Sequence, residues 1–128
     1  MRFHNGCWTK TKGTELFSPK EVHFFEVKDN ILSICAPTNP IRHRGDVLEG
    51  INLTICISSP APDVIRVQTK HHLGVTHHGP DFELNLPDKS CLDIQEKEDK
   101  FLLTSGGLTL EVGKNPFYLI YKRGDEVI

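Results

Sequence analysis

A run of alternating residues at 51–58 constrains the fold of this chain more than any other segment. Large aliphatic side chains occupy every second position, and polar or small residues stand between them. A period of two is typical of a β-strand with one buried face. Prolines interrupt the pattern at 59–63, and the alternation resumes over 64–70, which predicts a β-hairpin over 51–70. The residues expected on its apolar face are Ile51, Leu53, Ile55, Ile57, Ile65 and Val67.

Similar short apolar segments, separated by turn residues, recur along the rest of the sequence. Asp29-Asn30 is a dipeptide that tolerates the left-handed conformation of a two-residue hairpin turn. A helix competes only over 90–100, where Ser90 and Asp93 imitate a capping box, but no apolar stripe of helical spacing accompanies them. About nine or ten strands and no helix predict an all-β fold, an antiparallel β-sandwich. Besides the hairpin, strands are expected at 21–28, 31–36, 91–95, 101–104, 108–112, 117–121 and from 127 on, with an edge strand at 82–86 and short strands at 7–9 and 16–17.

Composition limits the class and the compartment of the protein. The 128 residues predict a single domain, 1–128. The net charge of −2 shows no excess of positive charge of the kind that binds a nucleic acid. The four cysteines contain no C-x-x-C pair, so free thiols in a reducing cytoplasm are expected. We find no signal-like segment and no apolar run of membrane-spanning length, and we therefore expect a cytoplasmic protein without a membrane partner.

Two histidine pairs, His71-His72 and His77-His78, lie in the one long segment without a strand or helix period, 71–80. Adjacent residues of an extended chain point to opposite sides, so each pair offers one metal ligand easily, and Asp81 or Glu83 would have to complete the site. Zinc sites normally show tighter ligand spacing. A solvated or interface loop is therefore the favoured interpretation, and we expect no metal and no other cofactor.

No complete active site is recognisable in the sequence. The motifs of nucleophilic serine enzymes, phosphate-binding loops, dinucleotide-binding folds and zinc proteases are missing. Most aspartates flank turns, where their side chains commonly bond nearby backbone groups. Trp8, Tyr118 and Tyr121 are the aromatic residues on which a sugar could stack, although strand aromatics more often pack in a core or across strands.

Several longer motifs follow one another across nearly the whole chain. N-G-C-W stands at 5–8, D-V-I-R-V-Q-T-K-H-H at 63–72 and G-P-D-F-E-L-N-L at 79–86. T-S-G-G-L-T-L-E-V follows at 104–112, and K-N-P-F-Y-L-I-Y-K-R-G-D-E-V-I at 114–128. In this order and spacing the motifs resemble the beginning of family 31 glycoside hydrolases, particularly bacterial enzymes of the α-xylosidase type.

The resemblance implies an N-terminal β-sandwich domain, similar in fold to galactose mutarotase and incomplete in this chain. Such a domain precedes a (β/α)8 barrel that carries an Asp nucleophile and an Asp acid/base. A barrel of that kind needs about 250 residues by itself, so we expect no catalytic residue in this chain. The implied partners are the downstream barrel and the carbohydrate substrate of the whole enzyme. The candidates for sugar or domain contact are His71, His72, His77, His78 and Trp8.

Two other functions and one assembly state remain open. The chain could be a separate carbohydrate-binding module that acts through its exposed aromatic residues. It could instead be a small mutarotase-like epimerase, with His71, His72 or His78 facing Glu83 across a cleft. An incomplete sandwich leaves an unpaired strand edge and uncovered apolar surface, which predicts a homo-oligomer.

Overall fold

The structure is a computed structural model that describes residues 13, 15–48, 50–70 and 90–128. Within these ranges the chain forms nine β-strands and one short 3-10 helix, and it contains no α-helix. No helix in the described ranges has the length and apolar character needed to cross a bilayer. The predicted all-β class is therefore confirmed.

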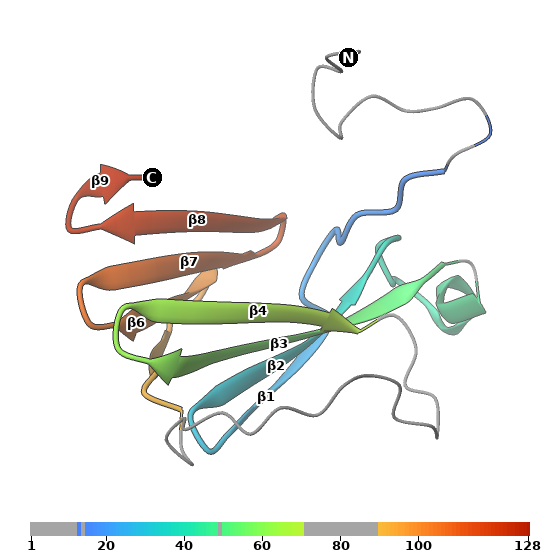
Figure 1. Ribbon diagram of the computed structural model, residues 1–128. Helices are drawn as coiled ribbons and strands as arrows, with labels where there is room; N and C mark the ends of the chain where they lie inside the picture. The colour runs from blue at the N-terminus through green and yellow to red at the C-terminus, as the bar shows by residue number, and fades with distance from the viewer. Residues whose placement is uncertain (1–12, 14, 49, 71–89) are drawn as a thin grey trace.

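Sheet A contains the first four strands in sequence order. They are β1 (Phe24–Lys28), β2 (Ile31–Pro37), β3 (Asn52–Ala61) and β4 (Val64–Lys70), and each pairs antiparallel with the next. The 3-10 helix η1 (Arg44–Leu48) lies in the connection between β2 and β3. The predicted hairpin of 51–70 thus corresponds to β3 and β4, and β4 is the marginal strand of this sheet (Figure 1).

Sheet B contains the remaining five strands, also in sequence order. They are β5 (Asp93–Glu96), β6 (Lys100–Ser105), β7 (Leu108–Lys114), β8 (Phe117–Arg123) and β9 (Glu126–Val127). Every neighbouring pair is antiparallel. β4 is thus the last strand of sheet A, whereas in sheet B two more strands, β8 and β9, follow β7 (Figure 1).

Tight turns fix the register of these hairpins. Asp29 and Asn30 have φ angles of 52° and 56°, the left-handed conformation that a two-residue hairpin turn requires. Asp63 has φ 63° in the turn between β3 and β4, and Gly106 has φ 58° between β6 and β7. Since a one-residue slip would move every side chain to the other face, these turns decide which residues enter the core.

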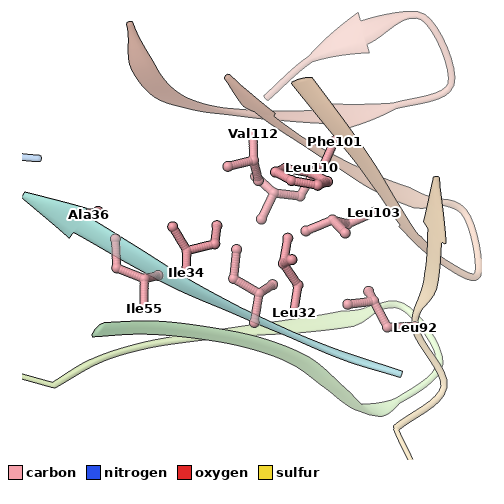
Figure 2. Packing of buried hydrophobic residues seen from close by; sticks show 10 residues of the cluster. Leu32, Ile34, Ala36, Ile55, Leu92, Phe101, Leu103, Leu110 and Val112 are labelled. Carbon is pink, nitrogen blue, oxygen red and sulfur yellow. The ribbon is translucent and has the colours of Figure 1, made fainter. Parts of the chain in front are cut away.

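The core lies between the two sheets and is built from the inward positions of their strands (Figure 2). Alternation along β3 buries Ile55 and Ile57, as the sequence predicts, and leaves Cys56 between them on the outward face. Phe101 is the largest fully buried side chain, and its ring meets that of Phe25 edge-on at 4.8 Å. The fully enclosed apolar residues are Leu32, Ile34, Ala36, Ile55, Ile57, Leu92, Phe101, Leu103, Leu110 and Val112.

A polar cluster joins the sheets at the end where β3 meets β6. Ser59 and Ser105 are buried, with hydroxyl oxygens in hydrogen-bond contact at 2.6 Å, and the Ala61 carbonyl oxygen lies within reach of both hydroxyls, at 2.8 and 3.3 Å. The Ser59 N–H donates to Ser90 Oγ at 2.9 Å, while the Ser59 carbonyl accepts from the Cys91 N–H at 2.9 Å. Buried polar groups are thereby satisfied where the chain passes from one sheet to the other.

Residues 20–22, before β1, connect the two sheets by backbone hydrogen bonds at the opposite side of the sandwich. Lys20 N–H donates to the Pro37 carbonyl in sheet A at 2.9 Å, and the Lys20 carbonyl accepts from Phe117 N–H in sheet B at 2.8 Å. Val22 N–H donates to the Lys114 carbonyl at 2.7 Å. The predicted strand of 21–28 consequently begins only at Phe24, because the residues before it bridge the two sheets.

Two details of the sequence prediction are wrong, and two predicted strands are not tested. Leu16 and Phe17 form no strand and are exposed. The expected break at 59–63 is shorter, since β3 continues through Pro60 to Ala61, past a β-bulge after Ser58. Proline is tolerated there because the pairing with β2 has already ended at Ile57. The strands predicted at 7–9 and 82–86 lie outside the described residues.

Candidate functional surface

The outward face of sheet B carries a connected group of polar side chains centred on Glu111. Directly opposite residues of an antiparallel pair share one face, so the strand registers define three rows across β6, β7 and β8. Glu111 stands at the centre, between Leu102 on β6 and Ile120 on β8. The rows on either side are Lys100, Gly113 and Tyr118, and Thr104, Thr109 and Lys122.

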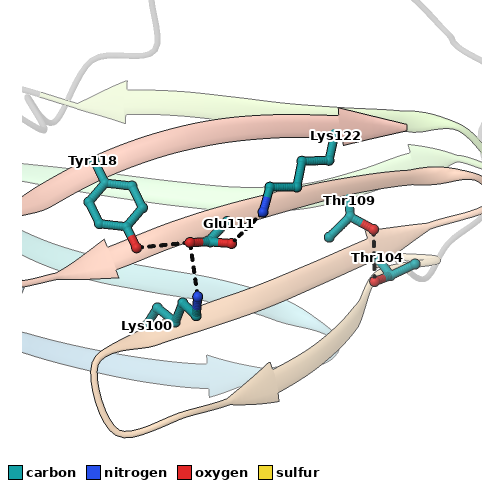
Figure 3. A network of polar contacts seen from close by, with 6 residues as sticks. All are labelled: Lys100, Thr104, Thr109, Glu111, Tyr118 and Lys122. Atoms are coloured by element: carbon teal, nitrogen blue, oxygen red, sulfur yellow. Dashed lines mark hydrogen bonds and ion pairs between the residues drawn. The ribbon is translucent and has the colours of Figure 1, made fainter. Parts of the chain in front are cut away.

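Glu111 is almost completely enclosed although it projects from an outward face. Its residue is 7% exposed, because neighbouring side chains fold over the carboxylate. Glu111 Oε1 accepts a hydrogen bond from Lys100 Nζ at 3.1 Å and from the Tyr118 hydroxyl at 2.9 Å. Lys122 Nζ donates to Oε2 at 3.0 Å from the other side (Figure 3). Every donor comes from a strand adjacent to β7, so the sheet register itself assembles the cluster.

The three donors stabilise the ionised form of the carboxylate. Hydrogen bonds from Lys122, Lys100 and Tyr118 lower the pKa of Glu111 to about 2, against the opposing effect of burial. The same contact with Glu111 raises the pKa of Lys100 and that of Tyr118. Glu111 is therefore an anion and Lys100 a cation throughout the neutral range.

A glycine makes room for the tyrosine of this cluster. Tyr118 on β8 lies directly opposite Gly113 on β7, and its ring covers the glycine backbone. A Cβ atom at Gly113 would overlap the ring carbons of Tyr118. The absence of a side chain at position 113 thus lets the phenol lie across β7 and reach Glu111.

The geometry favours a fixed, charge-paired surface over acid/base chemistry. A carboxylate with a pKa of about 2 holds no proton to donate at neutral pH. Glycoside hydrolysis needs two carboxyl groups about 5 to 9.5 Å apart across a bound sugar. The partners of Glu111 in the described structure are two lysines and a phenol, so this cluster supplies no such pair.

The structure places only part of the predicted contact residues. The described ranges exclude Trp8, Glu83 and the histidine loop, and the predictions for His71, His72, His77 and His78 therefore stay predictions. Tyr118 takes part in the Glu111 cluster. Tyr121 lies on the opposite face of β8, packed against the core, and burial raises its pKa. The two tyrosines therefore do not form one sugar-stacking platform.

Other sequence-derived expectations concern turns and thiols. Asp29 and Asp63 lie in turns and have left-handed backbone conformations, which agrees with the turn role predicted for them from the sequence. Among the described cysteines, Cys35, Cys56 and Cys91 are free thiols. No group of three or more potential metal ligands occurs within the described ranges.

Sequence reasoning missed the Glu111 cluster. Glu111 stands at a polar position of an alternating strand, where a solvent-exposed side chain is the ordinary expectation. Its two lysine partners, Lys100 and Lys122, lie eleven residues before it and eleven residues after it in the sequence. The tight turns beside β7 were the available signal, because they set the registers that bring both lysines to its flanks.

The fold and this surface define an all-β domain of two antiparallel sheets, an incomplete β-sandwich. The chain is 32% identical over 108 residues to the α-xylosidase XylQ of Lactiplantibacillus pentosus, across 84% of this chain and 14% of that protein. It is 27% identical over 121 residues to an α-xylosidase of Emericella nidulans, across 94% of this chain and 15% of that protein. No protein-family model matches the chain.

These comparisons confirm the resemblance to glycoside hydrolases of the α-xylosidase type that the motif order predicts. The chain spans about one seventh of the length of the curated relatives it matches, 14% and 15%. The similarity therefore concerns a small part of each relative and nearly all of this chain.

Proposed function

We propose that residues 1–128 form the N-terminal β-sandwich domain of a longer α-xylosidase-like glycosidase. In this proposal the domain is a non-catalytic scaffold of the galactose mutarotase-like type. Hydrolysis of terminal α-linked sugars takes place, with retention of configuration, on a downstream (β/α)8 barrel. The domain's partners are that barrel and, through it, the carbohydrate substrate, and the enzyme acts in the cytoplasm.

One observation carries the proposal. An alignment that uses 84% of this chain uses only 14% of the L. pentosus α-xylosidase, so most of that protein has no counterpart here. A (β/α)8 barrel requires about 250 residues, more than this chain contains. The Glu111 cluster agrees with a scaffold role, because its carboxylate is held ionised by three donors and forms no acid/base pair.

A domain-replacement experiment tests the scaffold role. The stretch of the L. pentosus α-xylosidase that aligns with this chain is replaced by this chain, and hydrolysis of 4-nitrophenyl α-xyloside is measured. We expect the chimera to retain activity within about a hundredfold of the parent, since small displacements of supporting elements cost rates of this order. The isolated chain is expected to hydrolyse none of the substrate.

Two controls make the result decisive. A chimera that carries an unrelated β-sandwich of similar size should be inactive, which separates specific support from mere filling of space. Where the chimera fails to fold, the isolated chain is added in trans to the enzyme lacking the aligned stretch, and partial recovery of hydrolysis is expected. A folded chimera no more active than the control, or hydrolysis by the isolated chain, would contradict the proposal.

A further inference from the structure

We propose that the outward face of sheet B binds a neutral sugar, with one pyranose ring stacked on Tyr118 and its hydroxyl groups bonded by Lys100 and Lys122. These three residues are called the Tyr118 platform below. The site takes part in no catalytic step, so this inference goes beyond the scaffold role and does not depend on a downstream barrel.

The Tyr118 ring lies across the neighbouring strand. It covers the backbone of Gly113 on β7, where a Cβ atom would overlap three of its ring carbons. An aromatic ring that takes the place of the missing side chain of a cross-strand glycine packs on the backbone with one face. Figure 3 shows the ring face-on, beside Glu111. The second face of the ring is therefore directed away from the sheet, as a flat apolar surface on which another ring can stack.

The hydroxyl group holds the ring in this orientation. The Tyr118 hydroxyl donates to Glu111 Oε1 at 2.9 Å, and the Glu111 carboxylate is ionised throughout the neutral range. Hydrogen bonds to a charged acceptor are stronger than neutral ones. Because the ring is fixed both by its face and by its hydroxyl, it loses little side-chain entropy when a ligand stacks on it, which favours binding.

Two lysine side chains provide hydrogen-bond donors near the ring. Lys100 Nζ bonds the same Glu111 oxygen as the Tyr118 hydroxyl, at 3.1 Å, and Lys122 Nζ bonds the other oxygen at 3.0 Å. An ammonium group has three N–H donors, and in the described structure each lysine uses one of them on Glu111. The lysine side chains are 30% and 33% exposed, against 9% for Glu111, so a ligand meets the donors and not the carboxylate.

These features select a neutral sugar as the ligand. A pyranose with equatorial hydroxyl groups has C–H groups on its faces and hydroxyl oxygens around its rim, so it stacks on a flat ring and accepts hydrogen bonds from lysine at the same time. The Glu111 carboxylate offsets one of the two lysine charges, and the whole chain has a net charge of −2, so little attracts a polyanion. A polypeptide strand would need a free sheet edge, whereas β7 is paired on both sides.

The same face continues past the length of one sugar ring. Thr104 and Thr109, with hydroxyl oxygens 3.5 Å apart, lie two rows from Tyr118. Successive rows are separated by two residues, so the threonines lie about 13 Å from Tyr118 along the strands. Hydroxyl groups at that distance can bond a further sugar unit. We therefore infer that the ligand is an oligosaccharide.

Binding of cellotetraose to the 128-residue chain tests the site. This probe is neutral, and the ring hydroxyl groups of its glucose units are equatorial. We expect saturable shifts of the backbone amide resonances of β6, β7 and β8, and saturation transfer from the Tyr118 ring protons to the axial protons of the sugar. Absence of saturable binding up to the solubility limit of the sugar, or shifts centred on sheet A, would overturn the proposal.

Three substitutions separate the presence of the ring from its orientation. Tyr118→Ala should weaken binding at least tenfold, because the stacking surface is lost. Tyr118→Phe keeps the ring and should cost only about threefold, through the lost bond to Glu111. Gly113→Ala leaves the whole Tyr118 platform in the sequence but displaces the ring, so it should weaken binding about as much as Tyr118→Ala. Unchanged binding in Gly113→Ala would contradict the stacking geometry.

Phe24→Ala is the matched control. Phe24 is 64% exposed on the outward face of sheet A, opposite Cys35. Its replacement should leave cellotetraose binding unchanged, and equal losses for Phe24→Ala and Tyr118→Ala would show non-specific contact with exposed aromatic rings. Where a Tyr118 or Gly113 variant loses its dispersed amide spectrum, Lys122→Met takes its place. It should weaken binding about fivefold through the lost donors, and unchanged binding would contradict the proposal.

The outcome is separable from that of the proposed function. Cellotetraose binding together with an inactive chimera would leave the Tyr118 platform standing and remove the scaffold role. An active chimera together with a chain that binds no cellotetraose would leave the scaffold role and remove the Tyr118 platform.

Discussion

Asp63 Oδ1 accepts a hydrogen bond from the Gly107 backbone N–H at 2.6 Å, and this contact joins a hairpin turn of sheet A to a hairpin turn of sheet B. Asp63 lies between β3 and β4, and Gly107 lies between β6 and β7. A Cβ atom at Gly106 would collide with the Asp63 carboxylate, so the glycine at position 106 permits the close approach. The Asp63 side chain therefore joins the two sheets at the same end as the Ser59–Ser105 pair.

Replacement of Asp63 by alanine should destabilise the fold by about 1 to 2 kcal/mol. The substitution removes one charge-assisted hydrogen bond and forces alanine into the left-handed conformation, φ 63°. The free energy of unfolding is measured by urea denaturation. Asp63→Asn, which keeps an acceptor oxygen and tolerates the same backbone conformation, is the control and should cost clearly less. Equal losses for both variants would contradict this account.

Substitution of Glu111 by glutamine should make stability less dependent on acid pH. The folded-state pKa of Glu111 lies at about 2, below its ordinary value of 4.5. The carboxylate thus contributes stability that is fully present above pH 4.5 and is lost as the pH falls toward 2. At pH 7, Glu111→Gln leaves Lys100 and Lys122 without their shared anion, and we expect a loss of about 1 to 3 kcal/mol.

Urea denaturation of wild type and Glu111→Gln at pH 7 and at pH 2.5 checks this dependence. The difference in unfolding free energy between the two proteins should shrink at the acid pH. Thr109→Ala, on the same face of β7, serves as control, because its effect should not change with pH. A Glu111 effect of constant size across this range would show that the carboxylate is not held ionised by its donors.

Gly113→Ala should destabilise the protein by about 1 to 3 kcal/mol, because the new methyl group overlaps the Tyr118 ring. The test is a double-mutant cycle with Tyr118→Ala. In the Tyr118→Ala background the added methyl group meets no ring, so Gly113→Ala should cost much less than it does in wild type. Additive effects would place the origin of the loss in the backbone of β7 and not in the tyrosine.

Local pattern was sufficient to predict most of the architecture. The alternation of 51–58 identified the buried face of β3, and Asp29-Asn30 identified a hairpin turn in the left-handed conformation. These features depend on near neighbours in the sequence. The bulge that admits Pro60 depends instead on where β2 ends, and the bridging role of Lys20 depends on strands from both sheets.

The candidate surface was less predictable for the same reason. Lys100, Glu111 and Lys122 are ordinary polar residues of three separate strands, and only the registers of two hairpins bring them together. Periodicity states which face a residue occupies but not which residues stand opposite it. The role of Gly113 depends on the same registers, since Tyr118 reaches it from the next strand.

Self-association of the isolated chain is the last prediction. Among the described residues β4 pairs only with β3, and Ile128 is exposed; strand edges and exposed apolar side chains promote association. We expect the contact to form between strand edges of two copies. Light scattering coupled to size exclusion should show a mass that rises with concentration. Ile128, beside the core-facing Tyr121, and Val127, opposite Lys122 on the outward face, are similarly exposed, and Ile128→Ser should reduce the rise more than Val127→Ser. A constant monomer mass at millimolar concentration would exclude this association.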